Sequence, residues 1–279
     1  MHLVGAFKRM ESSLSFLPRG GKSLGKSALI ALLLLLLIPA IARAEAVDPA
    51  SSPMPPVDVG LDPGHSRADV GAVGGGLREY DLTLDVATRV GELLRERGLS
   101  VALSRYDDNP LTDFSSPDPT DAVRLEQEAR IAAVGSARLY VSIHFNGYDD
   151  PRVRGAETYF NGDDHGAESR ALAESIQGEL LAEVRAAGYP LADRGAKEDL
   201  AAGKPYGHFF SLRGDMPSAL VESMFLTNPS DVAQLWDESI REAVARGIAD
   251  GISDYLTQYP SQLTMQDAQA ATKQDGQDW

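Results

Sequence analysis

The sequence predicts an α/β fold, a single domain in which a twisted, mostly parallel sheet has helices on both faces. The main observation is that short runs of Val, Leu and Ile alternate with longer segments whose apolar residues recur every three or four positions. That alternation is typical of parallel strands joined by helices. The second observation is size, because 279 residues, 43% of them hydrophobic, provide enough apolar surface for one large core.

Residues 1–44 have the composition of an export signal. Scattered Lys and Arg precede an uninterrupted apolar run at 28–38, and small residues follow it up to Ala44. The run is shorter than the ~20 apolar residues that a spanning helix needs, so a signal peptide cleaved after Ala44 is favoured over a permanent anchor. Residues 45–56 are rich in Pro, Ser and Ala and are predicted to be a linker.

The predicted domain spans residues 57–260 and begins with an apolar strand. This strand is expected to end before Pro63, because proline has no backbone donor for the ladder. The elements expected in this half are a strand at 57–61, a helix at 79–97, a strand at 99–105 and a helix capped by Thr120. Gly98 directly follows the first helix and ends it.

The second half of the domain continues the same alternation. The elements expected here are strands at 139–143 and 156–160, a helix at 166–187, strands at 208–212 and 219–221, and a helix at 231–256. Gly247 and Gly251 lower the helix propensity of the last element. Residues 261–279 are polar and rich in Gln and Asp, so they are predicted to form a mobile tail.

The charge balance excludes several classes of partner. The formal net charge is −15, and cleavage after Ala44 removes six basic side chains and one acidic one, which leaves −20. Such a surface repels nucleic acid and anionic lipid, so neither nucleic acid nor, after signal cleavage, a membrane is expected as a partner. The chain has no cysteine, so any metal must be held by His, Asp or Glu.

Four side chains with metal-binding or acid–base chemistry are expected at one edge of the sheet. His65 and His144 each follow a predicted strand, Glu79 opens the next helix, and Glu222 follows the strand at 219–221. Two imidazoles and a carboxylate are typical of catalytic zinc, which keeps a fourth position for water. Taken singly, each residue also has a structural explanation, such as a turn end, a core histidine or an acid at a helix N-terminus.

Four further polar residues near these positions have two explanations each. Asp62 and Asp69 flank the first histidine. For each of them, one explanation is that it orients an imidazole, and the other is that it caps a turn. Asn146 contacts a peptide substrate or caps its own loop. Arg194 meets a substrate carboxylate or a neighbouring acid.

Five motifs in register resemble the zinc-dependent N-acetylmuramoyl-L-alanine amidases of the amidase-3 type. They are LDPGHSRADVGAVG, LREYDLTLDVA, LYVSIHFNG, ADRGAKED and MPSALVESMFLTNPSD, within residues 57–255. The resemblance implies that His65, Glu79 and His144 bind zinc and that Glu222 is the catalytic acid/base. It also implies hydrolysis of the amide between N-acetylmuramic acid and the L-alanine of the stem peptide in peptidoglycan.

Two other functions fit the same sequence. Another exported zinc peptidase or deacetylase acting on wall fragments would use this scaffold, and a catalytically inactive wall-binding protein would keep the fold. The expected partners are peptidoglycan or muropeptides. Because no wall-binding repeats are visible, a targeting or activating protein partner is also considered. The signal predicts an exported protein, periplasmic rather than extracellular.

Overall fold

The computed structural model describes residues 56–163 and 165–260. The predicted signal peptide at 1–44, nearly all of the linker and the tail at 261–279 lie outside the described residues. Within the described ranges, no helix is both long and apolar enough to cross a lipid bilayer.

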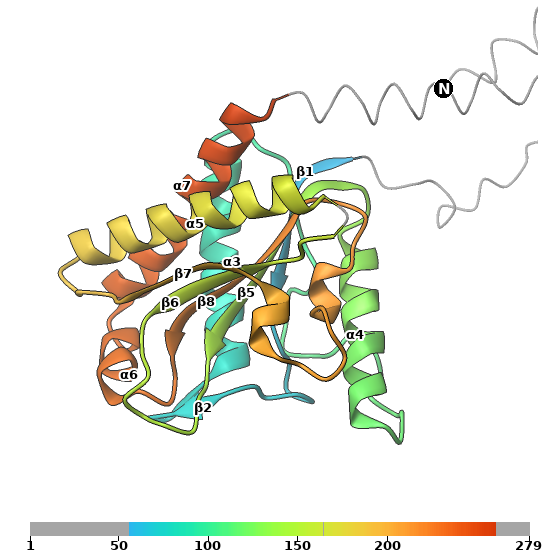
Figure 1. Cartoon of the computed structure of the whole chain (residues 1–279), viewed down its shortest axis with the longest axis horizontal. Helices are drawn as coiled ribbons and strands as arrows, with labels where there is room; N and C mark the ends of the chain where they lie inside the picture. The colour runs from blue at the N-terminus through green and yellow to red at the C-terminus, as the bar shows by residue number, and fades with distance from the viewer. Residues whose placement is uncertain (1–55, 164, 261–279) are drawn as a thin grey trace, which may run out of the picture. The chain divides into compact units, whose positions relative to one another are not determined.

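A six-stranded sheet forms the centre of the domain (Figure 1). Its strands, in spatial order, are β4 (Val101–Leu103), β1 (Val57–Pro63), β5 (Ala137–Asn146), β8 (Ser218–Phe225), β6 (Ala156–Phe160) and β7 (Asp193–Glu198). The first four are parallel to one another, β6 is antiparallel to β8, and β7 is parallel to β6. The predicted mostly parallel sheet is therefore confirmed.

Helices cover both faces of this sheet, as predicted. They are α3 (Glu79–Glu96), α4 (Pro119–Ala133), α5 (Gly166–Ala186), α6 (Pro229–Leu235) and α7 (Glu238–Gln258), with the 3-10 helices η2 (Asp199–Ala202) and η3 (Phe210–Leu212). On one face, α3, α5 and α7 enclose the main apolar core. The other face packs against α4 and η3 through two smaller apolar clusters.

Strands β1, β5 and β8 are longer than the sequence predicts. β1 continues through Pro63, which lies opposite Ile143 of β5. The hydrogen-bond ladder continues at the next residue, where Gly64 N donates to Ile143 O at 3.0 Å. The pairing at this position therefore does not require a backbone donor from Pro63. His144 and Glu222 consequently lie within β5 and β8, whereas the sequence predicted them just after strand ends.

Several predicted boundaries are wrong for local reasons. Asp118, not Thr120, caps α4, because its side chain accepts a hydrogen bond from the backbone N of Thr120. The predicted strand at 208–212 is instead a turn followed by η3. The predicted helix at 231–256 is divided into α6 and α7, since the Asp237 side chain caps a new helix.

Three short strands were not predicted. Two form the hairpin of β2 (Val73–Gly74) and β3 (Leu77–Arg78), and the third is β7. β7 has the sequence DRGAKE and lies at the edge of the sheet, with no fully buried residue. It therefore lacks the apolar alternation from which a strand is recognised.

Two glycines of α7 allow α5 and α7 to approach closely. A Cβ atom at Gly247 would lie 2.5 Å from Cα of Leu180, and one at Gly251 would lie 2.5 Å from Cα of Ile176. These are the same glycines that lower the helix propensity of α7. Their role is therefore in packing, since any side chain would separate the helices.

We expect Gly251→Ala to lower the free energy of unfolding by about 1–3 kcal/mol, because the added methyl group overpacks the α5–α7 contact. The matched control is Gly178→Ala on the exposed side of α5, where a Cβ would meet nothing within 4 Å. The control should raise stability by roughly 0.5–1 kcal/mol through helix propensity alone. Denaturant unfolding measures both, and equal effects of the two variants would contradict the packing role.

Candidate metal centre

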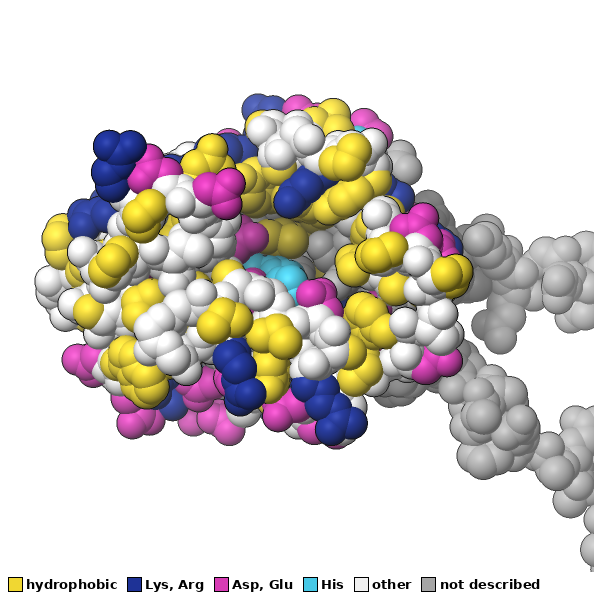
Figure 2. Space-filling model, turned by 90° about the horizontal axis from the view of Figure 1, so that it is seen from below, with side chains coloured by type: hydrophobic (Ala, Val, Ile, Leu, Met, Phe, Trp, Pro, Cys, Tyr) yellow, Lys and Arg dark blue, Asp and Glu magenta, His cyan; other side chains and the backbone are white. Residues whose placement is uncertain are grey.

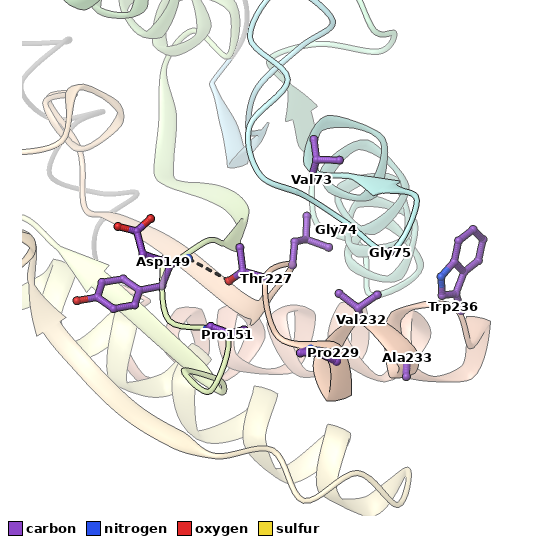
Figure 3. Close-up of a pocket in the computed structure, with 12 residues that line it drawn as sticks. Val73, Gly74, Gly75, Asp149, Pro151, Thr227, Pro229, Val232, Ala233 and Trp236 are labelled. Carbon is purple, nitrogen blue, oxygen red and sulfur yellow. Dashed lines mark hydrogen bonds between the residues drawn. The ribbon is translucent and has the colours of Figure 1, made fainter.

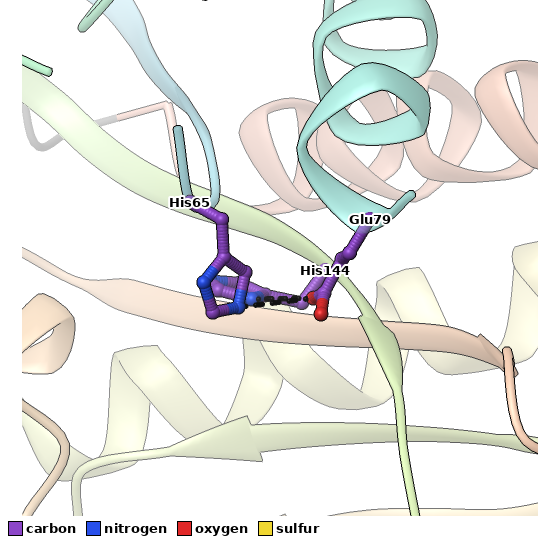
Figure 4. A group of neighbouring side chains, drawn as sticks. All are labelled: His65, Glu79 and His144. Carbon is purple, nitrogen blue, oxygen red and sulfur yellow. Dashed lines mark hydrogen bonds and ion pairs between the residues drawn. The ribbon is translucent and has the colours of Figure 1, made fainter. Parts of the chain in front are cut away.

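His65, Glu79 and His144 lie together where β1 and β5 end and α3 begins (Figure 4). One ligand atom from each lies within 4.8 Å of the others. Glu79 Oε1 is 3.3 Å from His65 Nε2 and 3.0 Å from His144 Nδ1. The imidazole rings are 4.8 Å apart between centroids and nearly perpendicular, so the structure brings all three predicted ligands to one point.

Backbone donors hold the Glu79 carboxylate in place. Its Oε2 accepts a hydrogen bond from Ala72 N at 2.7 Å, and its Oε1 accepts one from Phe145 N at 3.0 Å. Glu79 is also the first residue of α3, where the helix dipole favours negative charge. The carboxylate is therefore fixed from both the loop after β1 and the strand β5.

His65 is held by its backbone and by its ring. Its backbone has a left-handed conformation with φ 61°, which residues other than glycine rarely adopt. Its Nδ1 donates to Asp69 Oδ2 at 2.9 Å, which leaves Nε2 directed toward Glu79. A carboxylate behind the imidazole is typical of metal-binding histidines, so Asp69 is the flanking acid that orients a ring.

Asp62, the other flanking acid, lies buried beneath the loop, and its hydrogen bonds go to side chains other than histidine. It accepts hydrogen bonds from Ser104 Oγ at 2.6 Å, Ser142 Oγ at 2.7 Å and Arg130 Nη1 at 3.1 Å. Burial opposes its ionisation, but the charge of Arg130 and the two hydroxyl groups lower the pKa of Asp62 to about 2. Asp62 is therefore a buried anion that anchors Arg130.

Two buried arginines hold the backbone of the loop that carries His65. Arg105 donates to the carbonyl oxygens of Pro63 at 2.9 Å and Gly64 at 3.1 Å. Arg130 donates to the carbonyl oxygens of Pro63 and His65, both at 2.6 Å. Each of the three consecutive carbonyl groups thus accepts a hydrogen bond from a guanidinium group, which fixes the position of His65.

The charges and the space at this site suit a divalent cation. Burial opposes a positive charge on His65, but the Glu79 carboxylate raises the pKa of His65 to about 10. The site therefore favours positive charge. Glycine leaves room for the donors to converge, because a Cβ at Gly64 would lie 2.3 Å from the ring of His144 and one at Gly71 would lie 2.4 Å from Glu79 Oε2. The donor set of two imidazoles and one carboxylate fits zinc.

Glu222 lies directly opposite His144 on the neighbouring strand. Its side chain is partly exposed, yet its Oε2 is buried and has no hydrogen-bond partner among the described residues. Burial, and then the negative charge of Glu79, raise the pKa of Glu222 well above its usual range. A carboxyl group whose pKa is raised beside such a site is suited to acid–base chemistry.

Glu157 of β6 is a site residue that the sequence analysis missed. It lies directly opposite Glu222, is buried, and accepts hydrogen bonds or ion pairs from four side chains: Asn146, Tyr159, Arg194 and Lys197. Arg194 thus meets a neighbouring acid, and Asn146 contacts both that acid and the backbone of its own loop. The available signal was a glutamate inside the predicted strand at 156–160, whose sequence is AETYF.

The other two histidines of the described ranges lie outside this centre. His165 is 3.4 Å from Asp215, and His208 lies between Asp199 and Asp163 at 2.7 and 3.1 Å. Neither belongs to the group of side chains that converge around Glu79. Both therefore serve as reference histidines for experiments on the centre.

The candidate centre is open to solvent. Figure 2 shows a hollow with histidine at its base and with acidic, basic and hydrophobic side chains around its rim. A separate groove of about 700 Å³ lies beside the β2–β3 hairpin and α6 and is lined by Val73, Val232 and Trp236, among others (Figure 3). None of the four predicted site residues lines that groove, so the chemistry is placed in the hollow.

Comparisons with known proteins identify relatives of the whole domain. The profile of the family described as N-acetylmuramoyl-L-alanine amidase matches residues 59–254. The germination-specific N-acetylmuramoyl-L-alanine amidase of Bacillus subtilis (strain 168) is 34% identical over 203 residues, which are 71% of this chain and 78% of that protein. N-acetylmuramoyl-L-alanine amidase LytC of the same organism is 35% identical over 187 residues, 67% of this chain but only 33% of LytC.

Solved structures show the same fold. The CwlD amidase of Clostridioides difficile, in complex with the GerS lipoprotein, matches with a TM-score of 0.62 and 28% identity and covers 72% of this chain and 98% of that one. The catalytic domain of CwlV, an N-acetylmuramoyl-L-alanine amidase from Bacillus (Paenibacillus) polymyxa var. colistinus, matches with a TM-score of 0.55 and 30% identity over 72% and 98% of the two chains. The chain therefore belongs to the N-acetylmuramoyl-L-alanine amidase family.

Proposed function

We propose that the protein is an exported, zinc-dependent amidase of peptidoglycan whose catalytic domain spans residues 57–260. Family membership makes hydrolysis of the amide between N-acetylmuramic acid and L-alanine its function, in preference to a peptidase, a deacetylase or an inactive wall-binding protein. The observation that supports zinc is the convergence of His65, Glu79 and His144 on one point, with the carboxyl group of Glu222 opposite His144 on the neighbouring strand.

In this proposal the three metal ligands and Glu222 have different roles in the reaction. His65 Nε2, a ring nitrogen of His144 and the Glu79 carboxylate hold the metal, and Asp69 keeps the first ring oriented. Bound zinc supplies a polarised scissile carbonyl and a bound water of lowered pKa. Glu222 accepts a proton from the attacking water and then delivers it to the departing amine of L-alanine.

The cellular setting follows from the sequence outside the described residues. The signal at 1–44 exports the chain, residues 45–56 link it to the domain, and 261–279 form a polar tail. We place the enzyme in the periplasm, acting on peptidoglycan or muropeptides without binding nucleic acid or, after signal cleavage, a membrane. Because the structure of the CwlD amidase is a complex with a lipoprotein, a protein partner for this chain is part of the proposal.

Glu222→Gln should keep zinc stoichiometry and lower kcat by about a hundred- to ten-thousandfold, because the amide side chain cannot shuttle the proton. The measurement is digestion of muropeptides, with mass spectrometry of the new lactyl and L-alanine ends and with chelator-treated enzyme as the blank. Near-normal turnover by the variant would remove Glu222 from the mechanism.

His144→Ala should reduce bound zinc from about one ion per chain to nearly none, because two protein donors remain in place of three. The control is His165→Ala, whose ring lies outside the cluster and should leave the zinc content unchanged. Elemental analysis of purified, dialysed protein measures both variants. Full zinc occupancy in His144→Ala would reject this ligand set.

Asp69→Asn should weaken zinc binding by about ten- to a hundredfold, since the amide no longer polarises and orients the His65 ring. Competition with a fluorescent chelator measures the dissociation constant. Asp215→Asn is the matched control, because it alters another aspartate beside a histidine that is not a ligand. Equal zinc affinity in both variants would assign Asp69 to turn structure only.

A further inference from the structure

A row of directly opposed residues runs from the candidate centre across the sheet. His144 on β5 lies opposite Glu222 on β8, which lies opposite Glu157 on β6. Directly opposed residues in neighbouring strands project from the same face of a sheet, and strands lie about 4.8 Å apart. Glu157 is therefore about 10 Å along this face from His144, with the catalytic acid between them.

Glu157 fixes two basic side chains beside this row. Its Oε2 binds Arg194 Nε at 2.8 Å and Lys197 Nζ at 2.6 Å, while its Oε1 is held by Asn146 and Tyr159. The carboxylate is only 3% exposed, so its geometry is rigid. Although burial opposes its charge, the two cations lower the pKa of Glu157, which keeps it anionic.

The two cations still have binding capacity. Their side chains are 35% and 32% exposed, and within the described ranges neither has another hydrogen-bond or ion-pair partner. Arg194 also lies over the ring of Phe225 at 5.1 Å, which restricts its motion. One carboxylate cannot neutralise both charges, so the cluster keeps one net positive charge on a chain whose formal net charge is −15. A small anionic group is the ligand that such a pair attracts.

We propose that Arg194 and Lys197, positioned by Glu157, form a subsite for the free carboxylate on the stem-peptide residue that follows L-alanine. The inference rests on the proposed function, because it takes the scissile amide to lie at the zinc centre. An extended peptide advances roughly 3.3–3.6 Å per residue, so L-alanine and the residue after it together reach about 7 Å, and a carboxylate that branches from the second residue reaches further. That span matches the spacing between His144 and the Glu157 cluster.

The test compares two substrates that differ at this one group: N-acetylmuramoyl-L-alanyl-D-isoglutamine and its free-acid counterpart, N-acetylmuramoyl-L-alanyl-D-glutamate, each with the γ-carboxyl blocked as its methylamide. The free acid then carries one free carboxylate on this residue, the α-carboxylate, and the amide carries none. With the full chain loaded with zinc, we expect kcat/KM for the free acid to exceed that for the amide by about three- to tenfold, mainly through KM. Equal kcat/KM values for the two would overturn the subsite while leaving the amidase function intact. If the enzyme cleaves neither these two substrates nor larger muropeptides, that result rejects the proposed function instead.

Variants assign the preference to the cluster. Lys197→Met should reduce the ratio of free-acid to amide kcat/KM toward one, and Lys197→Arg should restore most of it. Glu157→Gln leaves both cations present but weakens their common anchor, so it should raise KM for the free acid more than it lowers kcat. Arg246→Gln on α7 is the control for charge, since it removes a cation of similar exposure, 41%, from a helix that provides none of the proposed site residues.

Circular dichroism and thermal unfolding establish that each variant is folded before the kinetics are compared. An unchanged substrate ratio in Lys197→Met and Arg194→Leu, both folded and both active, would contradict the proposal. So would a ratio that shifts equally in Arg246→Gln, because that result would mean that net charge rather than the cluster sets the preference.

Discussion

The candidate centre depends on a buried ionic network beneath the loop that follows β1. Asp62 holds Arg130, and Arg130 and Arg105 together bind every backbone carbonyl from Pro63 to His65. Burying charges is unfavourable unless each is paired and hydrogen-bonded, and here the pairing is used to fix a loop rather than to fill a core. His65 can therefore hold a left-handed backbone conformation that an isolated turn would not maintain.

Around this fixed loop, two carboxyl groups acquire opposite properties. Burial opposes the charge of Glu79, but the two imidazoles, through the charge of His65 and through hydrogen bonds from both rings, hold the pKa of this carboxylate well below its usual range. The Oε2 atom of Glu222 is buried and has no hydrogen-bond partner within the described ranges, and burial together with the charge of Glu79 raises the pKa of this carboxyl group. One carboxylate suited to a metal and one carboxyl suited to proton transfer thus arise from environments a few ångströms apart.

The order of strands arranges these groups along one line. The loop after β1 and the strand β5 carry the histidines, β8 carries the acid, and β6 with β7 carries the Glu157 cluster. Apart from β6 and β7, the adjacent strands of this line are not consecutive in the sequence, because the order in the sheet is β4, β1, β5, β8, β6, β7. The proposed peptide path, from metal to acid to cations, therefore follows the direction perpendicular to the strands.

The sequence alone determined the α/β class, the family resemblance and the four residues of the proposed centre, because periodicity and short motifs are local properties. It also located α3, α5 and β6 to within one residue of their observed bounds. Tertiary structure decided the rest. Glu157 and β7 lack an apolar pattern of their own, and their importance comes from cross-strand pairing with Glu222 and from the contacts of Arg194 and Lys197. The choice of Asp69 over Asp62 behind His65 likewise depended on distances set by buried arginines, which residue spacing does not encode.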